Sequence, residues 1–90
     1  MTPYRTTAVF DEETLPAALR KEHCTKAGAW GIIRVLEGKL RLAFPGGREE
    51  LLDPSHPGLI RPEEIHFVEP LGTMRMRVEF YDRDPAITQG

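Results

Sequence analysis

The residues best suited to chemistry in this chain are its three histidines, together with a cysteine and a lysine beside one of them. His23 is followed by Cys24 and Lys26, while His56 and His66 lie in the second half of the sequence. Neutral imidazole binds zinc, copper, iron and nickel, and a deprotonated thiol is a soft metal ligand. These residue types therefore predict a site for a metal ion or a small ligand.

Two interpretations stay open for each of the two more informative histidines. His66 lies in an apolar strand pattern, so it is either a hydrogen-bonded core histidine or a metal ligand or general base inside a barrel mouth. His23 follows a predicted helix, and a cation is favourable at a helix C-terminus, but the same residue could serve as a ligand. A catalytic zinc site commonly has three protein ligands and a water molecule, so His56, Cys24 or a carboxylate would have to complete it.

The remaining candidates have equally plain structural interpretations. His56, between Ser55 and Pro57, is expected to be an exposed turn residue. Cys24 is expected to be a small buried or half-buried side chain. Lys26 precedes a glycine two residues later and would bind an anion or remain a solvated loop lysine, whereas Trp30 would stack on a ligand or pack.

Composition excludes several classes of protein. The chain has 90 residues, a net charge of -2 and a single cysteine, which predict one domain over residues 1–90 without an internal disulfide. Twelve basic residues against fourteen acidic ones argue against a nucleic-acid partner. No apolar run approaches the roughly 20 residues needed to span a bilayer, and no signal peptide is recognisable, so we expect a cytoplasmic protein without membrane contact.

The hydrophobic pattern predicts a mainly β protein with one short N-terminal helix. Thr14–Glu22 is the helical candidate, with Thr14 as its cap and Leu15 and Leu19 facing the core. Short alternating segments joined by glycine and proline turns favour a sandwich or barrel. The predicted strands are Arg5–Phe10, Ala29–Glu37, Lys39–Phe44, Arg48–Leu52, Gly58–Arg61, Ile65–Glu69 and Met74–Tyr81.

Several separated segments resemble one known family. HCTKAGAWG at residues 23–31 and VLEG at residues 35–38 resemble the H-x-T-K-x-G-x-W and V-L-x-G segments of the TehB/YeaR-like family of small cupin-like domains. Segments 60–62, 66–70 and 79–81 match in the same order. The family is named after the N-terminal domain of the tellurite-resistance methyltransferase TehB, and its own role is unassigned. The resemblance implies a cupin-like double-stranded β-helix, a small β-barrel.

The resemblance also implies which residues would hold a ligand. If Gly38 closes the first cupin motif, the motif glutamate falls on Gly31, and the paired histidines fall on or next to Cys24 and Lys26. His23 lies beside those positions, and His66 matches the histidine of the second motif. A centre of three histidines and a glutamate is therefore not expected. His23 and His66 are the implied metal residues, and they do not decide between zinc, nickel and iron.

The same alignment predicts a subunit interface and two competing functions. With Gly31 inside the barrel, Trp30, Ile32 and Leu36 would form an outward apolar face, which we expect to join a homodimer. One function is metal or small-ligand binding in the barrel mouth, in a tellurite or other stress response. The alternative is a non-catalytic dimeric module without metal, which either binds a small ligand near Lys26, Trp30 and His66 or serves as an interaction domain. The sequence leaves catalysis undecided, and methyl transfer is not carried over.

Overall fold

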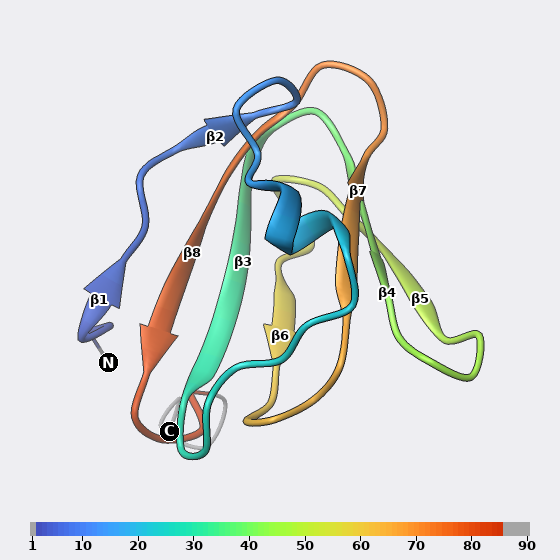
Figure 1. Ribbon diagram of the computed structural model, residues 1–90. Coiled ribbons are helices and arrows are strands. Elements are labelled where there is room, and N and C mark those ends of the chain that lie inside the picture. The colour runs from blue at the N-terminus through green and yellow to red at the C-terminus, as the bar shows by residue number, and fades with distance from the viewer. Residues whose placement is uncertain (1, 86–90) are drawn as a thin grey trace.

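The computed structural model describes residues 2–85, so Met1 and residues 86–90 of the expected domain lie outside the described residues. Within them the chain forms strands and one short 3₁₀ turn, η1 (Figure 1). The elements are β1 (Arg5–Thr6), β2 (Phe10–Asp11), η1 (Ala17–Arg20), β3 (Trp30–Glu37), β4 (Leu40–Ala43), β5 (Glu49–Leu52), β6 (Gly58–Ile60), β7 (Phe67–Pro70) and β8 (Arg75–Tyr81). The mainly β class predicted from the pattern is confirmed.

The strands form two antiparallel sheets that enclose one core. The larger sheet has the order β1-β8-β3-β6, with β2 also paired to β8, and the smaller sheet has the order β5-β4-β7. Figure 1 shows η1 on one side of the molecule, between β3 and β7. The finer expectation of a cupin topology stays a prediction.

The long strand β3 has one buried face and one outer face. Gly31, Ile33 and Val35 are buried, whereas the residues that alternate with them are half-buried or exposed. Ile33 lies opposite Val78 of β8 and Gly58 of β6. The predicted inward face of this strand is therefore confirmed, and it forms part of a core that comprises Leu15, Ile33, Val35, Leu40, Leu42, Phe44, Leu52, Ile60, Val68, Met74, Met76 and Val78.

The helix expected over Thr14–Glu22 is too long. Only Ala17–Arg20 is helical, and it is a single 3₁₀ turn. The Thr14 hydroxyl accepts a hydrogen bond from the Asp11 N–H, while the Asp11 carboxylate accepts from the N–H groups of Glu13 and Thr14, so Thr14 closes a turn instead of capping a helix. Lys21 then returns to an extended conformation.

The edge strand expected over Arg5–Phe10 is divided into β1 and β2. Between them the Thr7 hydroxyl accepts a hydrogen bond from the Val78 N–H, at 3.0 Å, in place of a backbone carbonyl. The Thr7 N–H still donates to the Val78 carbonyl, at 2.9 Å. This side-chain substitution interrupts the regular ladder along β8. No helix in residues 2–85 is long and apolar enough to cross a membrane.

Candidate functional site

His23 and His66, the two implied metal residues, lie side by side next to the start of β7, an edge strand of the smaller sheet. The His23 N–H donates to the His66 carbonyl at 2.9 Å, and the His66 N–H donates to the His23 carbonyl at 2.8 Å. This isolated antiparallel bridge ties the segment after η1 to the residue before β7. His23 therefore does not end a helix, as expected from the sequence, because η1 already stops at Arg20.

The imidazoles lie against each other, and each has one nitrogen tied to the backbone. The ring centroids of His23 and His66 are 4.2 Å apart, at an angle of 56°. Nδ1 of His23 donates to the Lys21 carbonyl at 2.9 Å, and Nδ1 of His66 donates to the Glu64 carbonyl at 2.7 Å. A carbonyl only accepts, so Nδ1 carries a proton in both rings, and Nε2 is the nitrogen that can offer a lone pair.

His66 is the more deeply buried of the two rings, since only 4% of the residue is exposed. Burial lowers the pKa of the His66 imidazole below its ordinary 6.5, and a charge on His23 lowers it further. The hydrogen bond to the Glu64 carbonyl raises this pKa, but its effect is smaller than that of burial. His66 is therefore neutral at pH 7, the protonation state that a metal ligand requires.

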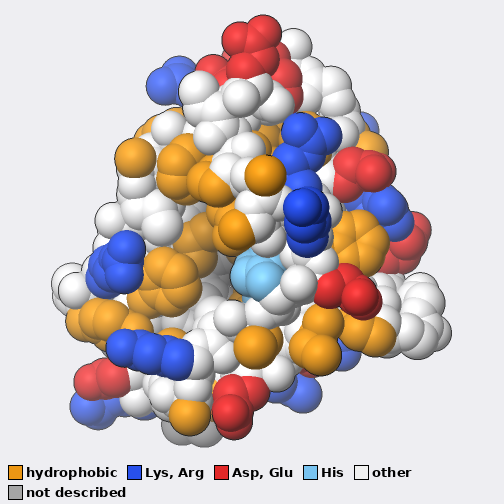
Figure 2. Space-filling view, viewed as in Figure 1, with side chains coloured by type: hydrophobic (Ala, Val, Ile, Leu, Met, Phe, Trp, Pro, Cys, Tyr) orange, Lys and Arg blue, Asp and Glu red, His pale blue; other side chains and the backbone are white. Residues whose placement is uncertain are grey.

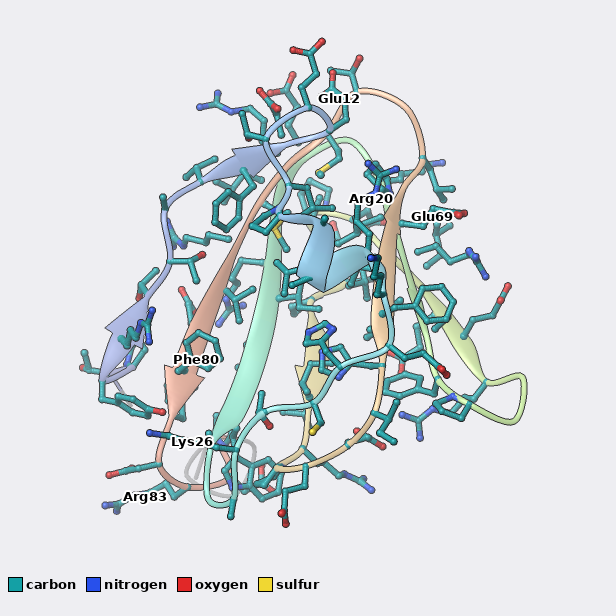
Figure 3. The ribbon with its side chains drawn as sticks, in the orientation of Figure 1. Glu12, Arg20, Lys26, Glu69, Phe80 and Arg83 are labelled. Atoms are coloured by element: carbon teal, nitrogen blue, oxygen red, sulfur yellow. The ribbon has the colours of Figure 1, made fainter. Side chains whose placement is uncertain are left out.

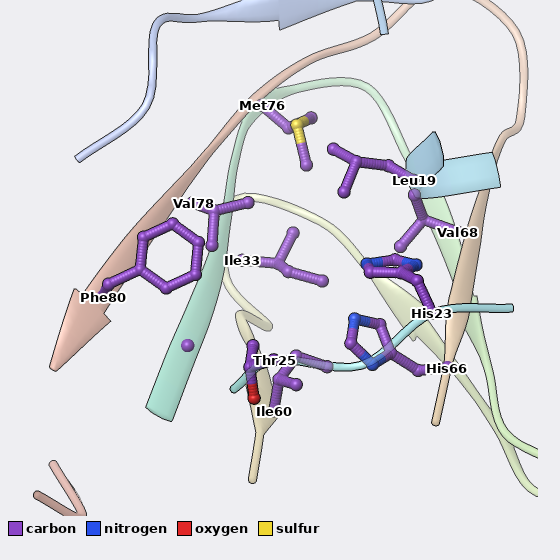
Figure 4. Close-up of a pocket in the computed structure, with 11 residues that line it drawn as sticks. Leu19, His23, Thr25, Ile33, Ile60, His66, Val68, Met76, Val78 and Phe80 are labelled. Carbon is purple, nitrogen blue, oxygen red and sulfur yellow. The ribbon is translucent and has the colours of Figure 1, made fainter. Parts of the chain in front are cut away.

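The histidine pair forms one wall of a narrow pocket between the sheets. Figure 4 shows a nitrogen of each ring on the pocket side, and Figure 2 shows a histidine in a hollow bordered by hydrophobic side chains. The pocket has a volume of about 40 Å³, whereas about 10–15 Å³ suffices for one water molecule. We call it the histidine pocket; its lining residues are Leu19, His23, Thr25, Gly31, Ile33, Ile60, His66, Val68, Met76, Val78 and Phe80.

Thr25 is a residue of this pocket whose role sequence reasoning missed. Its hydroxyl donates to the Ala29 carbonyl at 2.8 Å and accepts from the Glu63 N–H at 3.3 Å. The Glu63 N–H also donates to the Thr25 carbonyl, at 3.1 Å. Thr25 thus fixes the segment that carries His23. Its place in the matching segment at residues 23–31 was the available signal.

The other predicted site residues are not brought to the histidine pair. Cys24 is exposed, contrary to the buried or half-buried position expected, because it alternates with His23 and Thr25 along an extended segment. His56 is exposed and pairs with Asp53 at 2.9 Å. Lys26 is exposed, and Trp30 lies on the outer face of β3, opposite the pocket-lining Gly31. A ligand role for Lys26 and Trp30 stays a prediction.

The histidine pair fits a metal ion only as an incomplete set of protein ligands. Two imidazoles with centroids 4.2 Å apart are near enough to share one ion, given zinc–nitrogen bonds of about 2.0–2.1 Å. Among residues 2–85, no group of three or more histidine, cysteine, aspartate or glutamate side chains is placed to hold a metal. Gly31, where the family resemblance would place the motif glutamate, has no side chain to offer. Any ion would complete its shell with water or a ligand.

Comparison with known proteins places the chain in a family. The model of the TehB-like domain matches residues 5–78, most of the chain. The chain belongs to the TehB-like family. Two similar sequences are the probable S-adenosyl-L-methionine-dependent methyltransferases TehB of Haemophilus influenzae strains Rd and 10810, 35% and 34% identical over 74 residues. Each alignment covers 76% of this chain and 26% of the relative, so the chain spans about a quarter of these TehB proteins.

Solved structures agree with this family relationship. The crystal structure of TehB from Haemophilus influenzae matches with a TM-score of 0.78 and 30% identity, over 87% of this chain and 30% of that one. A crystal structure of a protein from Escherichia coli K12 matches with a TM-score of 0.74, over 91% of both chains. Its 18% identity supports a common fold alone.

The lowered pKa of His66 predicts that this TehB-like domain loses stability in mild acid. The unfolded chain binds a proton at His66 more readily than the folded chain does. The contribution of neutral His66 to the free energy of unfolding is therefore fully present above pH 6.5 and is lost as the pH falls through the folded-state pKa. Urea unfolding between about pH 7.5 and about pH 5 should show a slope of at most ~1.4 kcal/mol per pH unit from this group. His66→Gln should flatten the slope, and an unchanged slope in this variant would contradict the assignment.

Proposed function

We propose that this domain binds a metal ion through Nε2 of His23 and Nε2 of His66. The observation that carries the proposal is the paired hydrogen bonding of the two Nδ1 atoms to backbone carbonyls. Metal-bound histidines usually donate their second ring N–H to such a partner, which fixes the tautomer and the orientation of the ring. Here both rings have that partner, and both lie on one wall of one pocket.

The chemistry of the site favours binding over catalysis. Two neutral imidazoles suit zinc, nickel or iron. A metal held by two protein ligands would leave positions for water or for an exogenous ligand, which it could polarise. The chain's own residues hold the rings, exclude bulk water through the apolar lining, and offer no general base besides the pair itself among the pocket-lining residues.

Metal titration of the histidine variants tests the proposal. Protein stripped with a chelator and then titrated with zinc should bind it stoichiometrically by calorimetry and elemental analysis. His66→Ala and His23→Ala should each weaken binding by at least about tenfold, since each removes one of two protein ligands. His56→Ala is the matched control, because His56 is exposed and lies outside the pocket. Zinc binding that is absent, or equal in all four proteins, would overturn the proposal.

A role in a tellurite or other stress response is part of the proposal and comes from the family relationship. The methyltransferase function in the names of the relatives is not proposed for this chain, because the matched part is about a quarter of those proteins. The metal-binding domain and the module without metal have one function in common, which is to bind a ligand and to sequester or present it.

A homodimer without metal is the second candidate, and the outer face of β3 favours it. Trp30 and Ile32 are only half-buried there, and Leu36 is 44% exposed. The same face carries Glu79, which accepts from Arg34 at 2.9 Å and from Arg77 at 3.3 Å. Because Arg34 and Arg77 are both held by Glu79 within the chain, the apolar residues beside them form a surface that the same surface of a second copy can cover about a two-fold axis. A second copy is therefore the proposed occupant.

Sedimentation equilibrium tests this interface directly. The wild-type protein is expected to be dimeric at micromolar concentration. Ile32→Lys should shift it to monomer, because a charge at the centre of an apolar contact cannot be solvated when two copies associate. Leu71→Lys, which alters an exposed leucine outside β3, should leave the dimer intact. A monomeric wild type would exclude the second candidate.

A further inference from the structure

A second cavity adjoins the histidine pocket and has a different chemical character. Phe80 of β8 lines both, so the apolar pocket and a more open groove meet at its side chain. The groove has a volume of about 290 Å³, and its lining residues are Tyr4, Arg5, Lys26, Ala29 and Phe80. We call it the cationic groove. The segment from His23 to Lys26 connects the two, since Thr25 lines the pocket and Lys26 lines the groove.

Two positive charges and two aromatic rings converge on this groove. The Arg5 guanidinium lies 5.9 Å from the centroid of the Phe80 ring. Lys26 approaches from the loop before β3, and Figure 3 shows it near Phe80 at the same end of the larger sheet. Figure 2 shows positively charged side chains on either side of hydrophobic ones beside the hollow that contains the histidine.

The two cations of the groove have no carboxylate partner within ion-pair distance in the described part of the chain. Several other arginines are occupied: Arg41, for example, contacts Glu49 at 2.7 Å and Glu69 at 3.2 Å. Asp82 lines a neighbouring cavity together with Lys26, and its carboxylate pairs with Arg83 at 3.3 Å. Arg5 and Lys26 are thus free to contact an anion without breaking an ion pair.

We propose that the natural ligand is a small carboxylate with a short apolar chain. Its carboxylate lies between Arg5 and Lys26, and its chain passes Phe80 and lies against the apolar wall of the histidine pocket. This inference rests on the proposed function, because it names the ligand class of that same pocket. An anion with an apolar body matches both halves of the cavity: charged donors bind the head, and Ile33, Ile60 and Val78 contact the tail.

The narrowness of the pocket limits the size of the chain. At about 40 Å³ the pocket admits a few methylene groups but leaves no room for a large ring system. An inorganic oxyanion would use only the cationic groove and leave the apolar pocket unfilled. Each methylene buried should contribute about 0.8 kcal/mol, so affinity is expected to rise about fourfold per carbon until the pocket is full.

Calorimetric titration of the purified chain with acetate, butyrate, hexanoate, hexylamine and inorganic phosphate tests the inference. Hexanoate should bind more tightly than acetate, and hexylamine, with the opposite charge, should not bind. Lys26→Ala and Arg5→Ala should each weaken hexanoate binding about fivefold to twentyfold, since each removes a charge-assisted contact. Lys39→Ala is the matched control, because Lys39 is an exposed lysine that lines neither cavity.

A separate variant tests whether the apolar chain of the ligand enters the histidine pocket. An added Cβ at Gly31 would lie 3.6 Å from both Ile60 and Val78, which is ordinary contact, so Gly31→Ala should fold normally and narrow the pocket. This variant should weaken hexanoate binding and leave acetate binding unchanged. Phosphate bound as tightly as hexanoate, or hexanoate binding that is unaffected in Lys26→Ala and Arg5→Ala, would overturn the inference.

The same titrations in metal-free and zinc-treated protein separate this inference from the proposed function. If the protein binds zinc stoichiometrically but its hexanoate affinity is unchanged in Lys26→Ala and Arg5→Ala, the ligand class is wrong and the metal site is still supported. Hexanoate binding that depends on Lys26, Arg5 and Gly31 in a protein that takes up no zinc would support the ligand class and overturn the metal site.

Discussion

Replacing Gly38 with alanine should lower the free energy of unfolding by at least about 3 kcal/mol, through backbone strain together with overpacking. Gly38 turns the chain between β3 and β4 at a φ of 76°, which L-residues rarely adopt. A Cβ there would overlap the Thr73 carbonyl oxygen and lie 3.0 Å from Cα of Met74. Both contacts are with backbone, and Met74 is fully buried, so neither side can yield easily.

The matched control for Gly38 is Gly46, which also has a positive φ, of 93°, but has no heavy atom within 4 Å of an added Cβ. Gly46→Ala should therefore cost only the backbone strain, about 1–2 kcal/mol. Urea unfolding monitored by circular dichroism compares the two variants. Equal destabilisation in both would show that φ alone, without the contact to Thr73, governs the turn.

The turn at Gly38 matters to the site because it sets how β3 leads into β4. β3 carries Gly31 and Ile33 on the pocket side, and β4 pairs with β7, which follows His66. A Gly38→Ala protein that still folds should consequently show weaker zinc binding than Gly46→Ala. Gly38→Ala is expected to lower both the free energy of unfolding and the affinity for zinc. His66→Ala is expected to lower the affinity for zinc without a matching loss of stability.

The strands could be predicted from the sequence because their burial follows a simple period of two. The alternation of Ile33 and Val35 with Ile32 and Arg34 survives in the structure as a buried and an outer face of β3. Tight turns at Gly38 and at residues 45–47 were equally visible, since glycine adopts conformations closed to other residues. Local chemistry sufficed for these elements.

The details of the site could not be predicted, because they depend on contacts between distant residues. Nothing local in the sequence shows that the His23 backbone pairs with that of His66, forty-three positions later. The two Nδ1 contacts involve carbonyls of Lys21 and Glu64, whose positions follow from the end of η1 and from the loop before β7. The family resemblance implied that His23 and His66 share one site. The residue types alone left a structural role and a ligand role open for each of them.

The early end of η1 has the same kind of cause. Helix propensity favoured residues 14–22, but Asp11 and Thr14 form a competing hydrogen-bonded turn, and the chain must become extended by Lys21 to bring His23 to the sheet. Pairing of His23 with His66 thus overrides local preference. Cys24 is exposed for the same reason, since its neighbours on either side face inward.

Leu42→Ala is expected to lower the free energy of unfolding by about 3 kcal/mol, because Leu→Ala changes in well-packed cores cost about 2.7–5 kcal/mol. Leu42 is fully buried in β4 and reaches across to the other sheet, where its Cδ2 lies 3.0 Å from the position of a Cβ on Gly58. The lost atoms leave a void between the sheets that regular strand pairing prevents from closing. Leu51→Ala, on adjacent β5 and 53% exposed, should change stability by less than about 0.5 kcal/mol.

A second substitution shows whether the void is the cause. Gly58→Ala alone should be destabilising, because its Cβ would lie 2.8 Å from Cδ1 of Leu52 as well as close to Leu42. With Leu42 reduced to alanine, one of those two crowded neighbours is gone, and the new methyl group partly fills the space left behind. The double variant should therefore be more stable than the sum of the single changes predicts, by about 0.5–1 kcal/mol in a double-mutant cycle. Strict additivity would mean that Leu42 stabilises the fold within its own sheet, and that the contact between the two sheets at Gly58 contributes little.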